Sequence, residues 1–444
     1  MVYRPKVDIN TIPLDNIASG NSLKSLVPES LKKEYKIVKD AEFKKDLALI
    51  SHFLQCSEYM DGDDYARAER MIERYYSAAH PSIQDPEDVP FEEKKHLFDS
   101  ILSPRFPAIS NPTFTFIDLF AGIGGFRLAM QQLGGKCVFA SEIDDSARKT
   151  YTYNYGIMPY GDITTEETKS LIPHHFDILC AGFPCQAFSQ AGLRLGFKDK
   201  TKGTLFYDVA TILERYQPSA FFLENVKGLL SNDKGQTIEI ILGRLREMGY
   251  YVPDPEIVNA MNFGVPQNRE RVFIVGFHPR TGITEDFCYP APTNTQARFG
   301  DIKEPVAVDV KYYLSEKYWQ TLVNHKKRHR LAGNGFGYEI IKDDDVANTF
   351  MAGAMGREHN LIVDDRQQER LPDTKYKGAT NSSFVRMLTP REAASLQGFP
   401  RDFIIPVSDY AAYRQFGNSV AVPAIRETGR QILEMLNQHA FHML

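Results

Sequence analysis

Residues 115–135 read TFIDLFAGIGGFRLAMQQLGG, and this stretch decides the fold. The apolar run at 115–120 has the length of one buried strand, and the glycines after it end the run. Residues 126–133 then carry apolar side chains at helical spacing until Gly134 and Gly135 stop the pattern. A strand, a glycine turn and a helix in this order predict the first unit of an α/β fold.

The same alternation continues to residue 277. Further apolar runs lie at 137–143, 175–184, 219–226 and 271–277, and helical patterns lie at 144–156, 203–218 and 236–249. These runs are apolar throughout, which is typical of strands that are covered on both faces. We therefore predict an α/β fold with a Rossmann-like, mainly parallel sheet that binds its ligands at the carboxyl ends of the strands.

The sequence predicts a chain of four parts. They are a helical N-terminal extension with a linker (1–112), the first part of the main domain (113–285), a small, irregular, β-rich domain (286–385) and a return to the main domain (386–444). The extension carries helical patterns at 23–35, 44–55 and 65–79 and ends in a proline-rich stretch. The small domain is rich in Gly, Asn and Asp, with strand-like pieces at 337–341 and 360–364.

The composition is that of a soluble globular protein. Of the 444 residues, 25% are charged and 12% are aromatic, and the formal net charge is −5. An acidic sum argues mildly against a nucleic-acid partner, but the position of the charges matters more than their sum. One run, HKKRHR at 325–330, is strongly basic, and a solvated loop is its plain interpretation.

The cysteines indicate a reducing compartment. The chain has Cys56, Cys137, Cys180, Cys185 and Cys288, and no two of them form a C-x-x-C pair. This pattern suits free thiols and predicts neither a disulfide framework nor a metal site. The N-terminus lacks the apolar core of a signal peptide, and no run of about 18 apolar residues occurs. We expect a cytoplasmic protein without a membrane span.

The glycine turn DLFAGIGG, residues 118–125, predicts a ligand site, because a ligand can approach such a backbone closely. Arg127 stands where the dinucleotide fingerprint has its third glycine, so a pyrophosphate is not the expected ligand. Glu142 ends the second strand, where it could accept hydrogen bonds from a ribose. Asp162 could accept from an adenine amino group. Together they suit an adenosine ligand without phosphates; the alternative is a packing turn with two capping carboxylates.

A candidate nucleophile lies in AGFPCQAFSQAG, residues 181–192. Cys185 stands between Pro184 and Gln186 where a predicted strand gives way to a loop, the usual position for a reactive side chain. A free thiol has a pKa of about 8.5 and needs a local positive field to react as thiolate. The alternative, a buried inert cysteine, suits Cys180 and Cys137 better.

Two further strand ends carry polar residues. Glu224 follows four apolar residues, and a carboxyl group in such an enclosed place tends to stay protonated and could donate to a ring nitrogen. Arg269 and Arg271 alternate on one face, with Gln267 beside them, and two guanidinium groups that point one way suit a phosphate or carboxylate. An ordinary surface pair is the alternative for the arginines.

Nine motifs in order resemble those of the bacterial C5-cytosine DNA methyltransferases of Dcm-like, restriction-modification type. They are DLFAGIGG (118–125), SEID (141–144), GDIT (161–164), GFPCQAFS (182–189), GTLFYD (203–208), ENVKG (224–228), QNRER (267–271), RMLTPREAASLQGFP (386–400) and QFGNSVAVPA (415–424). The resemblance covers residues from about 114 to 435. Ala187 and Phe350 depart from the commonest pattern, where many members have Pro and Leu.

The resemblance implies a Rossmann-like, S-adenosylmethionine-dependent methyltransferase domain with residues 286–385 as its target-recognition domain. Such an enzyme transfers a methyl group to C5 of a cytosine that is flipped out of duplex DNA. Cys185 would attack C6, Glu224 would bind the ring at N3, and Arg269 and Arg271 would orient the base and its phosphate.

The resemblance also implies binding residues. The cofactor pocket would be lined by Phe120, Gly122, Ile123, Gly125, Glu142, Ile143, Asp162, Ile163, Pro184, Leu205, Asn418 and Val420. Gln186, Asn334 and Thr349 would contact DNA, and the basic run 325–330 becomes a candidate for phosphate contacts.

Other activities remain alternatives. tRNA cytosine methylation, which one branch of this fold performs, is disfavoured by the length of region 286–385, about a hundred residues, which suits the reading of duplex DNA. A DNA-binding regulator with a helix-turn-helix in residues 1–102 is disfavoured because that segment has no concentrated basic face. The D/N-P-P-Y/F tetrapeptide of exocyclic-amine methyltransferases is absent from the sequence. We expect a monomer that acts on double-stranded DNA, either alone as an orphan enzyme or beside a cognate restriction endonuclease.

Overall fold

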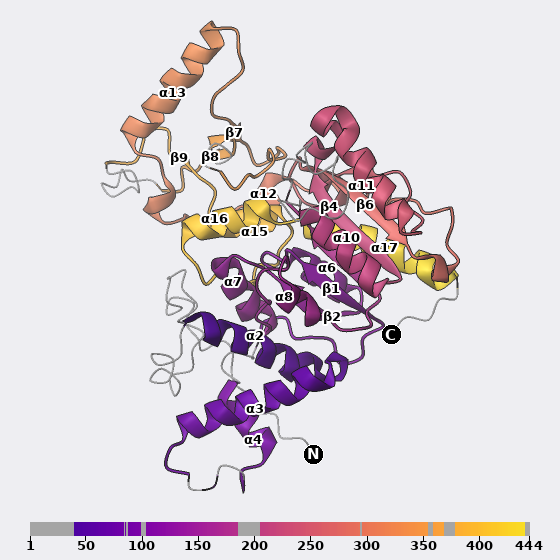
Figure 1. Ribbon diagram of the computed structural model, residues 1–444. Helices are drawn as coiled ribbons and strands as arrows, with labels where there is room; N and C mark the ends of the chain where they lie inside the picture. Colours follow the sequence, from indigo (N-terminus) through magenta and orange to yellow (C-terminus); the bar gives the residue numbers. More distant parts are fainter. Residues whose placement is uncertain are drawn as a thin grey trace.

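The computed structural model describes residues 40–83, 85, 88–98, 104–184, 205–293, 295–353, 358–367 and 378–439. A six-stranded sheet in the order β2-β1-β3-β4-β6-β5 lies at its centre (Figure 1). The strands are β1 (Phe114–Leu119), β2 (Gly135–Ser141), β3 (Ile178–Gly182), β4 (Ala220–Val226), β5 (Glu256–Asn259) and β6 (Glu270–Phe277). The pairs among the first four strands are parallel, and β6 pairs antiparallel with both β4 and β5.

The predicted, mainly parallel sheet is confirmed, with two differences at one edge. The run at 271–277 forms a strand, but this strand is antiparallel to its neighbour β4. The edge strand β5 was not predicted from the sequence. Only Val258 of its residues is buried, so its sequence has no apolar run to mark it.

Both faces of the sheet are buried, as the continuous apolar runs predicted. Successive residues of one strand belong to different apolar clusters, since Phe116 and Phe222 pack on one face and Ile117 and Leu223 on the other. The first face is covered by α6 (Gly125–Gln132), α7 (Asp145–Tyr155) and α17 (Val422–Gln438). The second is covered by α2 (Asp40–Cys56), α10 (Leu205–Tyr216) and α11 (Gln236–Glu247).

The C-terminal segment contributes three helices. They are α15 (Pro390–Leu396), α16 (Asp409–Asn418) and α17. Thr389 begins α15 with a capping box, in which its hydroxyl and the Glu392 carboxylate each accept a backbone N–H of the other residue. α17 packs against α6, and Val420, which precedes α17, lies beside Gly125 of the glycine turn.

The N-terminal extension is helical, as predicted for 44–55 and 65–79. Its helices are α2, α3 (Gly62–Ala79) and the short α4 (Phe91–Lys95), and they lie below the sheet in Figure 1. The helical pattern at 23–35 lies outside the described residues. α2 packs on the sheet edge formed by β2, and α3 packs on α2.

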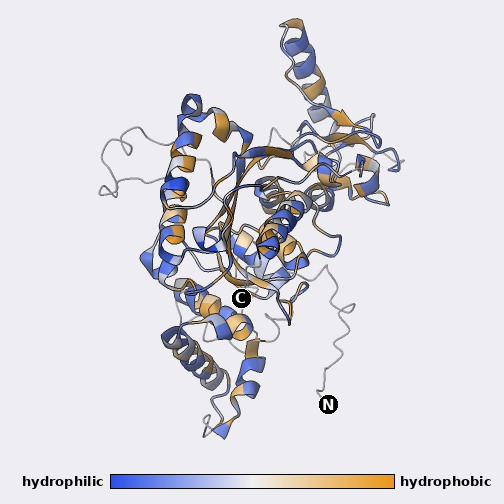
Figure 2. Cartoon of the chain, turned by 90° about the vertical axis from the view of Figure 1, so that its right-hand side faces the viewer, coloured by the Kyte–Doolittle hydropathy of each residue, from blue (hydrophilic) through white to orange (hydrophobic). Residues whose placement is uncertain are grey.

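Region 286–385 has its own small sheet, in the order β7-β8-β9. The strands are β7 (Ile340–Ile341), β8 (Leu361–Val363) and β9 (Val385–Arg386), and the first two coincide with the predicted strand-like pieces. The basic run does not lie in a loop: it forms the last turns of α13 (Glu316–Leu331). Ser315 caps this helix, and Trp319 and Leu322 bury one side of its first half. Figures 1 and 2 show α13 projecting from the rest of the chain.

The remaining elements are short. They are α8 (Glu166–Ser170), α12 (Phe299–Ile302) and the 3-10 helices η5 (Ser57–Tyr59), η7 (His96–Phe98), η9 (Lys227–Gly235), η10 (Ala260–Phe263), η11 (Pro279–Thr281) and η12 (Val310–Tyr312). Among the described helices, none has the length and apolar character needed to cross a bilayer.

Candidate active site

The turn between β1 and α6 leaves its backbone open. Phe120, Gly122 and Gly124 have φ angles of 54°, 55° and 84°, so the chain passes through the left-handed region three times between strand and helix. Apart from Gly122 and its two chain neighbours, the described residues place no heavy atom within 4 Å of the position that a Cβ of Gly122 would take. Ile123 of the same turn is buried and anchors it to the core. The turn therefore offers free space directly over its backbone.

Glu142 lies next to this turn. Its Oε2 accepts the N–H of Gly122 at 2.8 Å, and its Oε1 accepts the N–H of Asp144 at 2.8 Å. Burial raises the pKa of this carboxyl group above its ordinary value, while the two backbone N–H groups act in the opposite direction. The next side chain, Ile143, is 70% exposed, an unusual position for an isoleucine. A half-buried carboxylate and an open apolar surface thus lie side by side.

Asp162 and Ile163 are held near the same strand end. Tyr160 forms a parallel bridge with Ser141, and its carbonyl accepts the N–H of Glu142 at 2.9 Å. Ile163 is buried, whereas the Asp162 Oδ1 accepts the N–H of Thr164 at 2.9 Å. Both predicted acidic residues therefore accept local backbone N–H groups, as the capping alternative requires, and they also share one corner of the sheet.

Val420 of the C-terminal segment packs against the glycine turn. The place of a Cβ on Gly125 is 2.7 Å from Val420 Cγ2, so only glycine fits there without a shift. Val420 Cγ1 also lies 3.8 Å from the corresponding position on Gly182, at the end of β3. Asn418 ends α16 and is exposed, and Leu205 begins α10. Val420 thus joins the glycine turn to the strand that leads toward Cys185.

Cys185 and Gln186 lie outside the described residues, but the strand end that precedes them is described. Gly182 pairs with Glu224 across β3 and β4, and the Asn225 amide donates to the Phe183 carbonyl at 2.8 Å. Pro184, which follows, is exposed. The neighbouring strand therefore holds the chain in place directly before the predicted nucleophile.

Glu224 is buried beside two guanidinium groups. Its Oε1 lies 3.1 Å from Arg271 Nε. Burial raises the pKa of Glu224 above its ordinary value, although the charges of Arg271 and Arg269 oppose this rise. The direction agrees with the expectation that this carboxyl group carries a proton more readily than a free one.

Arg269 is not part of a surface pair, because it is only 2% exposed. Its Nη1 donates to the Phe350 carbonyl at 3.2 Å, and its Nη2 donates to the carbonyls of Gly417 and Ser419 at 3.3 and 2.6 Å. Burial and the nearby Arg271 lower the pKa of Arg269 to about 9, while Glu224 acts against this shift. Nε has no hydrogen-bond partner among the described residues. Arg269 thus connects three separate segments of the chain.

The segment 347–350 of region 286–385 runs along residues 266–269. Gln267 bridges to Ala347, and its side chain accepts the N–H of Phe350 at 2.7 Å. The Thr349 hydroxyl donates to the Asn268 carbonyl at 2.6 Å, so Thr349 lies next to Arg269 as predicted for a residue near the site.

Asn334 lies elsewhere. It is exposed in the loop after the projecting end of α13, where its Oδ1 is 2.6 Å from His329 Nδ1. The structure therefore brings Thr349, but not Asn334, to the residues around Glu224.

Three features of the site were not predicted from the sequence. Asn225 steadies the strand before Cys185, Ser419 accepts from Arg269, and Gly417 permits a close backbone contact. A Cβ on Gly417 would lie 2.3 Å from the backbone nitrogen of Ala352. The only signal in the sequence was their place inside the motifs ENVKG and QFGNSVAVPA.

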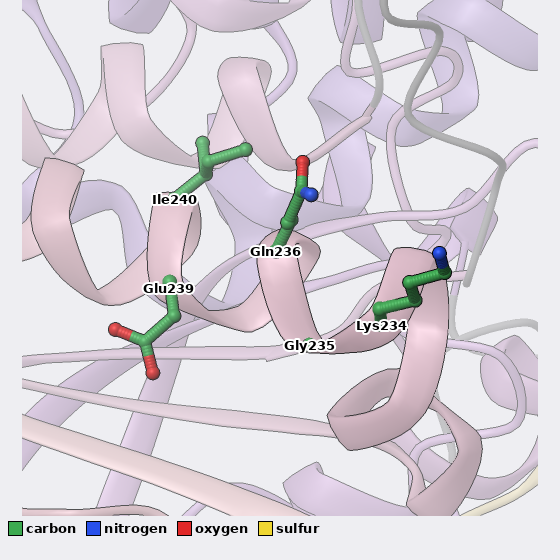
Figure 3. A pocket seen from close by; sticks show the side chains of 5 residues that line it. All are labelled: Lys234, Gly235, Gln236, Glu239 and Ile240. Atoms are coloured by element: carbon green, nitrogen blue, oxygen red, sulfur yellow. The ribbon is translucent and has the colours of Figure 1, made fainter.

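A shallow hollow of about 400 Å³ lies at the start of α11, lined by Lys234, Gly235, Gln236, Glu239 and Ile240. Figure 3 shows the side chains of Lys234, Gln236 and Glu239 pointing in different directions. Among the described residues, no group of His, Cys, Asp or Glu could hold a metal ion.

Comparison with known proteins gives a consistent result. The family model described as C-5 cytosine-specific DNA methylase matches residues 114–434. Type II methyltransferase M.HpaII of Haemophilus parainfluenzae is 62% identical over 336 residues, which cover 74% of this chain and 93% of the relative. The DNA-cytosine methyltransferase of Escherichia coli K12 is 37% identical, with 78% of this chain and 83% of the relative covered.

Solved structures share the fold. A mutant DNMT2 of Spodoptera frugiperda superposes with a TM-score of 0.53 at 20% identity, over 73% of this chain and 99% of that chain. An E. coli protein described as a putative DNA modification methyltransferase gives a TM-score of 0.52 at 21% identity, with 73% and 99% covered.

Proposed function

Because the chain belongs to the C-5 cytosine-specific DNA methylase family, we propose that it methylates cytosine at C5 within a specific duplex sequence, with S-adenosylmethionine as donor and Cys185 as nucleophile. The assignment of the catalytic residues rests on the environment of Glu224. It is a buried carboxyl group with a raised pKa, and it pairs with the strand end that leads to Cys185.

The residues at the end of β1 and β2 fit S-adenosylmethionine. The open backbone at Gly122 leaves room for the ligand, with Phe120, Ile123 and Gly125 as the rest of the turn. Glu142 would accept from the ribose, which would replace its present bond to Gly122, and the exposed Ile143 would cover one face of the adenine. The remaining contacts would come from Asp162, Ile163, Pro184, Leu205, Asn418 and Val420. When bound, the cofactor supplies an electrophilic methyl group.

The chain's own residues then perform the acid–base and nucleophilic work. The thiolate of Cys185 would bond to C6, which pushes electron density to C5 and makes this carbon nucleophilic. A protonated Glu224 would donate to N3 and stabilise the charge that develops on the ring. After methylation, loss of the C5 proton and release of the thiolate restore the aromatic ring. All of this needs a cytosine outside the duplex stack, at a cost of a few kcal/mol.

The two arginines have different tasks in this proposal. Arg271 lies against Glu224 and is placed to hold both the carboxyl group and the base. The Nη atoms of Arg269 donate hydrogen bonds to three backbone carbonyls, so Arg269 acts chiefly as a positioning residue. Its Nε remains available to the base or its phosphate.

DNA contact is proposed for region 286–385. Lys326, Lys327, Arg328 and Arg330 are exposed on the last turns of α13, a concentration of positive charge in a chain whose net charge is −5. Lys327, Arg328 and Arg330 form no ion pair with any described residue, which leaves them available to phosphates. Gln186, Thr349 and Asn334 would contribute contacts nearer the target base.

The proposed setting is the cytoplasm, where a monomer would modify DNA alone or beside a cognate restriction endonuclease. Transfer of tritium from labelled S-adenosylmethionine to unmethylated duplex DNA tests the activity, with Cys185→Ala in parallel. Incorporation by the wild type alone is expected, and bisulfite sequencing then gives the target. Transfer to tRNA and not to DNA would replace the proposal with RNA methylation.

A duplex with 5-fluorocytosine at the target position tests Cys185 separately. Fluorine at C5 cannot leave as a proton does, so the enzyme should remain covalently bound to the DNA. The wild type is expected to give a band that survives denaturing electrophoresis, and Cys185→Ala should give none. A surviving band with the variant would assign the nucleophile to another residue.

A further inference from the structure

Helix α2 lies outside the residues that the methylase family model matches, yet it packs against β2 at the edge of the sheet. Its residue His52 is 1% exposed. The ring nitrogen Nδ1 lies 2.8 Å from the Ala48 carbonyl, which can only accept, so Nδ1 carries the proton. Nε2 is then an acceptor, and it lies 3.3 Å from the backbone nitrogen of Ala140 in β2. Burial lowers the pKa of His52 to about 3, which keeps this acceptor available at neutral pH.

The same ring touches the segment that supports Glu142. His52 stacks on Tyr160, with ring centroids 4.1 Å apart and planes at 17°. Tyr160 in turn stacks on Phe139 of β2, at 5.1 Å and 26°. The backbone of Tyr160 donates to the Ala140 carbonyl at 2.8 Å and accepts from Glu142 at 2.9 Å. His52 therefore contacts the ring of Tyr160, whose carbonyl accepts the Glu142 N–H, and the N–H of Ala140, whose carbonyl accepts the Tyr160 N–H.

Other α2 residues hold the ends of this segment. The Ser51 hydroxyl accepts the N–H of Met158 at 2.9 Å, and Gln55 donates to the Tyr155 carbonyl at 3.2 Å. Lys44 pairs with Asp145 at 2.6 Å and Lys45 with Glu167 at 2.9 Å. These contacts span residues 140–167, which carry Glu142, Ile143, Asp162 and Ile163. α2 thus supports the adenosine side of the proposed pocket.

We propose that α2 is a cofactor-positioning element of this methylase, in which His52 fixes Glu142 through Ala140 and Tyr160. The inference rests on the proposed cofactor site. It assigns a task to the extension that is distinct from DNA contact.

The test is steady-state kinetics of full-length His52→Phe. Phenylalanine keeps the stacked ring but leaves the Ala140 N–H without its acceptor. We expect the KM for S-adenosylmethionine to rise about five- to tenfold, with kcat and the KM for DNA within about twofold of wild type. His52→Gln can restore an acceptor, and its KM should return toward the wild-type value.

Tyr75→Phe is the matched control. It removes the hydroxyl that donates to Asp46 and accepts from Arg74, inside the extension and away from β2. It should lower Tm without changing the KM for S-adenosylmethionine. If His52→Phe behaves in the same way, α2 serves only stability and the proposal is overturned.

Two additions keep the outcomes distinguishable. Should His52→Phe fail to fold, Ser51→Ala removes the acceptor of Met158 and should raise the same KM by a smaller factor; an unchanged KM would again overturn the proposal.

Calorimetric titration of Glu142→Ala with S-adenosylmethionine tests the pocket itself. Unchanged binding by Glu142→Ala would reject the proposed cofactor site, whereas weak binding by Glu142→Ala and normal binding by His52→Phe would reject the role of α2 alone.

Discussion

The six-stranded sheet buries apolar side chains on both faces, whereas region 286–385 has one small apolar cluster of its own, formed by Leu314, Trp319, Leu322, Leu361, Val385 and Met387. A buried ionic network joins Asp364 of this region to Arg386 and Glu392 of the segment that follows it. Arg386 forms two hydrogen bonds of 2.8 Å with Glu392 at the start of α15, and its Nε donates to Asp364 at 2.7 Å. All three side chains are at most 1% exposed.

The comparison teaches that the two regions depend on different forces. The sheet tolerates small losses, because many apolar contacts share its stability. The network gives little net stability, but it requires one arrangement, since each removed partner leaves a buried charge unpaired. We infer that region 286–385 is positioned by directional contacts, which suits a part whose orientation to DNA matters.

The largest expected effect is that of Arg386→Ala. Removal of the guanidinium leaves Glu392 buried without its counter-charge and leaves Asp364 with Arg366 alone, at a cost of about 3–5 kcal/mol. Trp319 is the single tryptophan of the chain and lies in region 286–385, so its fluorescence in urea reports this region while far-UV circular dichroism reports the whole. The fluorescence transition should move to lower urea than the dichroism transition. Coincident transitions would mean that the two regions unfold as one unit.

Leu223→Ala in β4 is the matched change on the side of the sheet. Its cost of about 2–5 kcal/mol should shift the dichroism transition at least as much as the fluorescence transition. A selective shift of the fluorescence signal would contradict the comparison.

The second effect concerns activity. Glu224→Ala should lower kcat about 10²- to 10³-fold, because the variant has one donor fewer for the developing charge. Its stability should not fall at pH 8. The folded pKa of Glu224 is raised, so ionisation of this group opposes folding at a pH above its unfolded value, and removal of the group relieves this cost. A large loss of stability would indicate that Glu224 serves packing instead.

The third effect is an acid transition. The hydrogen bonds and charges of Arg366 and Arg386 outweigh the effect of burial and lower the pKa of Asp364 to about 2. A lowered carboxyl pKa gives stability that is present above the unfolded value and is lost as pH falls toward the folded one. Trp319 fluorescence should therefore report weakening between about pH 4 and 2. Asp364→Asn should remove much of this dependence, and an unchanged acid profile would exclude Asp364 as its source.

The smallest effect is expected for the surface of α13. Lys327→Ala with Arg330→Ala should weaken binding to all duplexes alike and reduce the slope of log K against log salt by about 1 for each phosphate that is no longer neutralised. Lys317→Ala, on an exposed position in the first turn of the same helix, is the control and should change the slope little. An equal effect of Lys317→Ala would mean that DNA binding depends on the overall charge of α13 and not on contacts at its last turns.

The sequence predicted the sheet far better than region 286–385. Strands such as β1 and β4 are marked by apolar runs because both of their faces are buried. α13 was missed, since only Trp319 and Leu322 of its residues are buried and no apolar periodicity results. Glu224 was predicted as a buried acid from its place at a strand end, but the carbonyl partners of Arg269 lie 81 to 150 residues away and have no local pattern.

The close approach of Gly417 to Ala352 sets a boundary for protein engineering. Residues 347–352 belong to region 286–385 in sequence, but they are fitted to the main domain through Gln267, Arg269 and Gly417. A chimera that takes its sequence specificity from another methylase must therefore keep these residues from the recipient and exchange the loops on either side of them. The fusion points of such a chimera should therefore lie within the region. Fusion points at the ends of the region would replace residues 347–352 and disrupt their packing against the main domain.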